Sequence, residues 1–163
     1  MDIGDTVGVH LMARVIYERS AGAIIFYIDD DGRRLYLLLH YPSGHWDFPK
    51  GIIEPGEEEL ETIYREVYEE TGIPRDKLML IDGFRKTINY KFMSHGNVVS
   101  KTVIFRLMRS LTMDVKISWE HKGYIWLEYP DAVKKATYKS AKNLLKEAEL
   151  YIRRLIKEGK IKV

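Results

Sequence analysis

The chain has 163 residues and a mass of 19.1 kDa, a common size for one folded domain, and 45% of its residues are hydrophobic. It contains no cysteine, which excludes disulfide bonds and thiolate metal sites, and a net charge of +2 does not by itself indicate nucleic-acid binding. No apolar run approaches the ~20 residues of a membrane span, and the first residues lack a signal-peptide layout. We therefore expect one cytoplasmic domain over residues 1–163.

Thermolabile side chains are scarce in this composition. The chain has no glutamine and three asparagines, whereas 31% of its residues are charged. This combination is typical of proteins from hyperthermophiles, in which Lys, Arg and Glu are abundant. We therefore expect a thermophilic source, and a melting temperature below ~60 °C would contradict that expectation.

The N-terminal third predicts a sheet preceded by a tail. Residues 1–12 show no periodicity, and we interpret them as a loosely attached tail. Strands are predicted over residues 13–17 and 20–28, which are rich in Val, Ile, Phe and Tyr. The acidic run Asp29–Gly32 predicts a hairpin turn, and residues 34–40 predict a strand that is buried on both faces because nearly all of it is apolar.

The segment 51–73 predicts a tight turn followed by one acidic helix. Glycine and proline supply the turn, at Gly51, Pro55 and Gly56. From about Glu57 onward, residues recur with helical spacing, at Leu60, Ile63, Tyr64, Val67 and Thr71. Gly72 ends the predicted helix.

Three acids of this helix, Glu66, Glu69 and Glu70, share a sector beside its apolar stripe. One interpretation is a solvated acidic face. However, like charges at this spacing repel by ~0.2–0.5 kcal/mol per pair, and Arg65 is the only cation between residues 51 and 73. Carboxylates held at the edge of a core are suitable oxygen ligands for Mg²⁺ or Mn²⁺.

Strands and a final helix are predicted after this segment. Two long strands span residues 78–90 and 98–108, and shorter strands span 115–118 and 123–127. Residues 129–135 predict a helical turn. An amphipathic helix follows, with apolar residues at Ala141, Leu144, Leu145, Ala148, Tyr151, Ile152, Leu155 and Ile156. This order of elements predicts an α/β sandwich with a mixed sheet and two main helices.

The acidic segment resembles a known family signature. The pattern Gly51-x5-Glu57-x7-Arg65-Glu66-Val67-x-Glu69-Glu70-x-Gly72-Ile73 matches all nine fixed positions of the Nudix box, the signature of the Nudix hydrolases. The resemblance implies an α/β/α sandwich whose loop–helix–loop binds divalent cations. It also implies hydrolysis of a nucleoside diphosphate linked to another group.

Further segments are similar to the asymmetric diadenosine tetraphosphate hydrolases. They are Ser20-Ala-Gly-Ala-Ile-Ile-Phe26, His45-Trp-Asp-Phe-Pro-Lys-Gly51, Glu54-Pro-Gly-Glu57, Gly83-Phe84, Asn89-Tyr90, Lys101-Thr-Val103 and Glu120-His121-x-x-Tyr124-x-Trp126-Leu127. This similarity implies cleavage of diadenosine tetraphosphate to ATP and AMP. It implies a small nucleotide as partner, without a membrane or an obligatory nucleic acid.

The resemblance also implies roles for the acids. Glu66 and Glu70 are the leading metal ligands, Glu69 is a third, and the Gly51 carbonyl and Glu57 contribute to the same site. Arg65 is expected to orient a glutamate. Glu120 has two open interpretations, a surface carboxylate or a metal-side group or general base, and His121 is expected to be structural. Which glutamate is the base stays open.

Substrate contacts are expected from basic and aromatic residues. Cations are expected to hold the phosphate chain, and Tyr90 and Tyr138 match positions that stack an adenine. The complete expected set is His45, Lys50, Lys86, Tyr90, Lys101, Tyr124 and Tyr138, and Arg85 lies on the same predicted strand as Lys86.

Other functions fit the same signature. The substrate can instead be the 5′ end of RNA, a nucleoside triphosphate or a diphosphoinositol phosphate. A Nudix domain can also sense a nucleotide without hydrolysing it. The complete set of acids argues against a sensor, because binding alone does not require it.

Overall fold

The computed structural model describes residues 14–163, so the expected tail over residues 1–12 lies outside the described residues. The strands are β1 (Val15–Ile28), β2 (Arg34–His40), β3 (Trp46–Asp47), β4 (Lys50–Ile52), β5 (Leu78–Ser94), β6 (Asn97–Ser110) and β7 (Gly123–Glu128). The helical elements are α2 (Glu59–Thr71), the 3₁₀ turn η1 (Arg75–Lys77), α3 (Tyr129–Lys135) and α4 (Lys139–Lys157).

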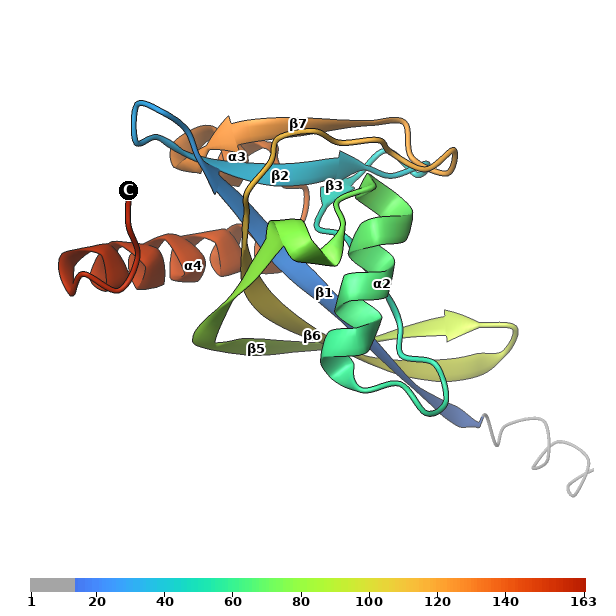
Figure 1. Ribbon diagram of the computed structural model, residues 1–163. Coiled ribbons are helices and arrows are strands. Elements are labelled where there is room, and N and C mark those ends of the chain that lie inside the picture. The colour runs from blue at the N-terminus through green and yellow to red at the C-terminus, as the bar shows by residue number, and fades with distance from the viewer. Residues whose placement is uncertain (1–13) are drawn as a thin grey trace, which may run out of the picture.

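The strands form one mixed sheet with the order β3-β2-β1-β6-β5, and β4 and β7 pair with β1 and β2. The β1–β6 pair is parallel, whereas the other pairs are antiparallel. Helix α2 covers one face of the sheet, and α3 and α4 cover the other (Figure 1). The predicted α/β/α sandwich with two main helices is confirmed.

Each face of the sheet has its own core, since side chains of a strand alternate between faces. On the α4 face, Phe26, Phe48 and Phe105 pack against the apolar stripe of α4. On the α2 face, Ile25 and Leu39 pack against Ile63 and Val67 of α2. The middle of β2 is fully buried, as the unbroken apolar run predicted.

The predicted turns form as expected. Gly32 has a φ of 79° and donates its N–H to the Asp29 carbonyl, which closes the β1–β2 hairpin. His95 and Gly96 both have positive φ and make the two-residue turn between β5 and β6. Because this tight turn continues the pairing, β5 and β6 extend further than predicted. Their ends project from the sandwich together with the start of β1 (Figure 1).

Two predicted strand assignments are wrong. Residues 13–17 and 20–28 are not separate strands: β1 is continuous from Val15, because β6 pairs with it in parallel along that length. Residues 115–118 form no strand. Their backbone N–H groups at Lys116 and Ser118 donate to the carbonyls of Thr71 and Glu70 instead. The segment thus caps the C-terminal end of α2 rather than joining the sheet.

The helix of the acidic segment starts later than predicted. It begins at Glu59 and not near Glu57, because Glu57 lies in the preceding loop and accepts the Glu54 N–H at 2.9 Å. The helix ends at Gly72 as predicted, and the φ of 72° at this glycine makes it a left-handed cap. Among residues 14–163, no helix is long and apolar enough to cross a membrane.

Candidate active site

Strand β4 brings the turn of the acidic segment against helix α2. Gly51 pairs with Ala21 of β1, and this pairing fixes its position opposite Glu66. A Cβ atom at residue 51 would lie 2.0 Å from Cδ of Glu66, so any larger residue would displace the carboxylate. Glycine is therefore required here for close approach, and Glu66 lies directly against the backbone of β4.

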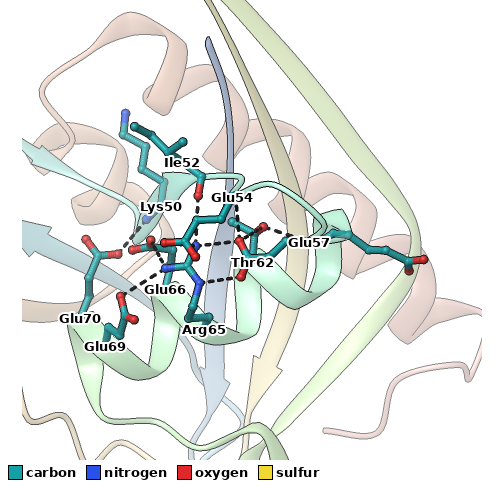
Figure 2. Close-up of polar contacts among 10 residues, drawn as sticks. Lys50, Ile52, Glu54, Glu57, Thr62, Arg65, Glu66, Glu69 and Glu70 are labelled. Atoms are coloured by element: carbon teal, nitrogen blue, oxygen red, sulfur yellow. Dashed lines mark hydrogen bonds and ion pairs between the residues drawn. The ribbon is translucent and has the colours of Figure 1, made fainter.

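Arg65 holds the carboxylates of the segment together (Figure 2). Its guanidinium donates to Glu57 at 2.6 and 2.8 Å and to Glu66 at 2.7 Å. A longer contact of 3.4 Å reaches Glu69, and the Ile52 carbonyl accepts at 3.0 Å. The pKa of Glu57 is lowered to about 2, mainly by its hydrogen bonds from Arg65. Arg65 thus lies where the resemblance implied an orienting role.

Glu70 lies at the centre of the site and is 8% exposed. Its Oε2 atom accepts the Lys50 N–H at 3.0 Å. Burial and the negative charge of Glu66 raise the pKa of Glu70 to about 8. Burial also raises the pKa of Glu66, against the effect of Arg65. Burial thus disfavours the charged form of both carboxylates.

A turn after β6 approaches Glu70 from its other side. His121 is buried, and its Nε2 atom lies 3.3 Å from Oε1 of Glu70, without hydrogen-bond geometry. The Nδ1 atom of His121 contacts Ser118 Oγ at 3.0 Å. Glu120 is exposed beside it, and its charge raises the pKa of Glu70 further. Glu120, which lies outside the acidic segment, therefore adds to the negative charge around Glu70.

The donor set fits a hard divalent cation. Within residues 14–163, no group of three or more acidic or histidine side chains is arranged as an assembled metal site. The carboxylates of Glu66, Glu69 and Glu70 nevertheless supply the oxygen donors that such a cation prefers, and three acids are gathered in one place with Arg65 as the cation that contacts Glu66 and Glu69. A divalent cation would offset their mutual repulsion.

A cavity of about 350 Å³ opens next to these acids on the α4 side of the sheet. Its lining is Asp47, Lys50, Ile88, Asn89, Tyr90, Tyr138 and Ser140. Lys50 contacts both the acids and the cavity lining, since its backbone N–H donates to Glu70 and its Nζ atom lies 3.2 Å from Asp47. Tyr90 comes from β5 and Tyr138 from the start of α4, so the fold brings the two predicted tyrosines to one cavity.

A row of contacting aromatic rings leads away from the cavity, starting at Tyr138. His45 lies between Tyr41, at 4.6 Å, and Tyr138, at 5.2 Å between ring centres. Tyr41 in turn contacts the ring of His121 at 4.7 Å and donates its hydroxyl to the Phe48 carbonyl at 2.6 Å. Burial lowers the pKa of His45, so the neutral ring is favoured.

The structure does not bring every expected substrate residue to this cavity. Lys101 pairs with Tyr90 across β5 and β6, and burial followed by the charge of Lys50 lowers its pKa, so it lies nearby. Lys86 instead lies 3.8 Å from Glu147 and lines another cavity with Tyr151. Tyr124 lines a third cavity, with Gly72 and Lys116.

Sequence reasoning did not identify Tyr41, Asp47 or Ile88 as site residues. Asp47 and Ile88 are 41 positions apart, and their strands, β3 and β5, are at opposite ends of the sheet order, yet both side chains line the same cavity. Tyr41 follows β2 directly, and nothing in the local sequence shows that its ring reaches His45. Asp47 is a charged residue within an otherwise apolar stretch, and in the structure it is only 4% exposed. A charged residue in such a stretch could have indicated a site residue.

Comparison with known proteins agrees with this geometry. A family model described as the NUDIX domain matches residues 18–148. The asymmetrical bis(5′-nucleosyl)-tetraphosphatase of Sus scrofa is 39% identical over 144 residues, which cover 82% of this chain and 95% of that protein. The protein of the same name from Mus musculus is 36% identical over 143 residues, with the same coverage.

A solved structure is similar over nearly the same region. It is the crystal structure of a Caenorhabditis elegans Ap4A hydrolase binary complex, with a TM-score of 0.75 and 32% identity. The match covers 83% of this chain and 98% of that chain. The family model spans the acidic segment, nearly all of the sheet and the first half of α4. The chain therefore belongs to the Nudix hydrolase family.

Proposed function

We propose that this protein is a cytoplasmic, Mg²⁺- or Mn²⁺-dependent hydrolase that cleaves diadenosine tetraphosphate into ATP and AMP. The observation that carries the proposal is that Lys50 links two places: it lines the cavity that holds Tyr90 and Tyr138, and its backbone N–H donates to Glu70 on α2. Two relatives with 36–39% identity are named asymmetrical bis(5′-nucleosyl)-tetraphosphatases, which supports the same substrate.

Glu66, Glu69 and Glu70, with the Gly51 carbonyl, would hold the divalent cation. When bound, the ion supplies positive charge to the phosphate oxygens and acidifies water. Phosphoanhydride cleavage depends mainly on such charge stabilisation and on positioning. The residues of the chain provide the positioning: Arg65 fixes Glu57 and Glu66, and the Lys50 N–H fixes Glu70.

The base of the substrate would enter the cavity between Tyr90 and Tyr138. Lys50 lines this cavity, His45 contacts Tyr138 and Lys101 pairs with Tyr90, and these three residues would contact the phosphate chain. One water is consumed: its oxygen forms a bond to a phosphorus atom, one of its protons passes to a carboxylate, and the bridging P–O bond of the anhydride breaks, so that the bridging oxygen leaves with the other nucleotide product. The carboxylates of Glu69, Glu70 and Glu120 are the candidates for the proton acceptor.

A panel of nucleotides tests the proposal. Dinucleoside tetraphosphates, nucleoside triphosphates, 5′-triphosphorylated RNA and a diphosphoinositol phosphate are each incubated with protein and Mg²⁺ or Mn²⁺, and products are separated by chromatography. We expect diadenosine tetraphosphate to have the highest kcat/KM. A higher kcat/KM for RNA would overturn the substrate, and binding without turnover of any compound would favour a nucleotide sensor.

A further inference from the structure

The cavity beside the acids has room for one nucleoside, at about 350 Å³. A dinucleoside tetraphosphate has two nucleosides, one at each end of its phosphate chain. If one base occupies the cavity and the chain crosses the acids, the other nucleoside lies beyond them. The residues that could contact the second nucleoside are therefore those on the far side of Glu70 from the cavity.

The turn at residues 118–121 occupies that side. The Glu70 carboxylate lies between Lys50, which lines the cavity, and His121, with contacts of 3.0 and 3.3 Å to its two oxygens. A row of contacting rings also leads from the cavity to the turn: it starts at Tyr138, passes through His45 and Tyr41, and ends at His121. The cavity is at one end of this row, and the turn is at the other.

This turn is held firmly at both ends. The Ser118 N–H donates to the Glu70 carbonyl at 3.3 Å, and the His121 N–H donates to the Ser118 carbonyl at 3.1 Å. The Lys122 N–H donates to the His40 carbonyl at 2.9 Å, which ties the following residue to β2. The turn is therefore fixed relative to Glu70.

Trp119 stands at the tip of this fixed turn and is 91% exposed. The other two tryptophans are engaged: Trp46 stacks on His40 with 4.3 Å between ring centres, and Trp126 donates its ring N–H to the Met113 carbonyl. An indole can bury ~150–250 Å² of surface, so leaving it in water forgoes a large gain in stability. Nothing in residues 14–163 covers Trp119, although its backbone is rigid.

We propose that Trp119 is a stacking surface for the second nucleoside of a dinucleoside polyphosphate, across the carboxylates from the cavity. An exposed, rigidly presented indole suits a base, because every nucleobase has a face that can stack and because little ordering is needed on binding. Trp119 then determines preference for two-base over one-base substrates, with little selectivity for which base is at that end. This inference rests on the proposed function.

The test compares two hydrolysis-resistant ligands with methylene bridges, diadenosine tetraphosphate and adenosine tetraphosphate, which lacks the second nucleoside. Binding is measured by calorimetry with Mg²⁺ for the parent, Trp119→Ala, Trp119→Phe and the control Tyr17→Ala. Tyr17 is another highly exposed aromatic residue, at 78%, on the projecting part of β1. None of these changes removes a packed side chain, so folding should be retained.

We expect Trp119→Ala to weaken binding of the two-base ligand by about fivefold or more, the loss of one stacked base, and to leave the one-base ligand unchanged. Trp119→Phe should retain most of the affinity, and Tyr17→Ala should match the parent with both ligands. Parent tryptophan fluorescence should change more with the two-base ligand than with the one-base ligand, and Trp119→Phe should abolish that difference.

Separate results would overturn the two proposals. If the parent cleaves diadenosine tetraphosphate but Trp119→Ala binds both ligands as the parent does, the role of Trp119 is wrong and the proposed function stands. If Trp119→Ala weakened binding of both ligands equally, the proposed role of Trp119 would also be wrong, because the lost affinity would not come from the second nucleoside. If the parent binds no two-base ligand, both proposals fail.

Discussion

Glu66 lies against the backbone of β4 and accepts a hydrogen bond from Arg65, so its charge is held in one place. Glu70 is buried beside it, and the Lys50 N–H holds one of its oxygens. Because each acid has a fixed position and a different environment, we expect single substitutions here to affect catalysis more than stability.

Glu66→Gln preserves the shape of the side chain and removes its charge. We expect turnover to fall by ~10²-fold or more while the melting temperature stays near that of the parent, because a cation ligand is lost but packing is kept. Glu61→Gln, on an exposed position of α2, is the matched control and should be fully active. Near-normal turnover of Glu66→Gln, or parent activity that EDTA does not diminish, would refute the metal assignment.

Tyr90 and Tyr138 are predicted to hold the first base with their rings. Replacing either with alanine should raise KM by about five- to a hundredfold, which corresponds to ~1–3 kcal/mol for one stacked base. Replacing either with phenylalanine should change KM little, since the ring is kept. Steady-state kinetics with diadenosine tetraphosphate provide the measurement. A phenylalanine variant as impaired as the alanine variant would show that the hydroxyl, and not stacking, is responsible.

Among the elements, β4 has a specific role although it is only three residues long. It pairs with β1 and presents Gly51 to Glu66. Gly51→Ala would place a Cβ atom where the Glu66 carboxylate lies, and we expect turnover to fall by ~10²-fold because the acid is displaced.

Gly123→Ala is the control for that substitution, because a Cβ atom there meets no atom within 4 Å. Both variants should be assayed for turnover and melting temperature. An active Gly51→Ala protein would mean that the position of Glu66 against β4 is unimportant for catalysis.

Helix α4 is fixed to the sheet by the buried carboxylate of Glu149, which is 2% exposed. Arg34, Tyr36 and Arg153 all donate to it. Burial alone would raise the pKa of Glu149, but these hydrogen bonds, led by that of Arg34, lower it overall. Since the folded pKa is depressed, this carboxylate contributes stability above its ordinary pKa of 4.5, and the contribution is lost as pH falls toward the folded value.

Glu149→Gln should therefore reduce the free energy of unfolding by about 3 kcal/mol or more at neutral pH. The difference between parent and variant should shrink once the pH falls below about 4.5, because the parent carboxylate then becomes protonated on unfolding. Urea denaturation of both proteins from pH 7 to pH 3 gives the measurement. A difference that is constant over this range would contradict the assigned pKa shift.

The elements with strong periodicity could be predicted from the sequence. The strand over residues 34–40 has the predicted bounds, and α4 and the Gly72 cap form as expected. Residues 115–118 could not be predicted, because their β-type sequence is overridden by the unpaired carbonyls at the end of α2. The secondary-structure propensity of a short segment does not reveal such contacts with a distant part of the chain.

The acids of the site could be predicted because they lie in one segment with a fixed spacing. The cavity could not be predicted in full, because its lining comes from β3, β4, β5 and the start of α4. Tyr124 was expected in it, but Tyr124 lines a separate cavity with Gly72 and Lys116, at the C-terminal end of α2.

In the whole molecule, the two faces of the sheet have different tasks. Helix α2 carries the acids on one face, whereas α4 and strands of the sheet form the cavity that we propose for the nucleoside. Strand β4, at the junction, joins the two through Lys50 and Gly51. The fixed distance between the cavity and the acids is what should select the anhydride bond that is cleaved.

That selection is tested most directly by hydrolysing diadenosine tetraphosphate in ¹⁸O-labelled water with Mg²⁺. Chromatography and mass spectrometry then identify every product and the position of the label. We expect ATP and AMP in equal amounts, no ADP, and the label in only one of the two products, because one base is held while water attacks one phosphorus atom. Formation of ADP, or label in both ATP and AMP, would contradict a cavity that fixes the substrate relative to the acids.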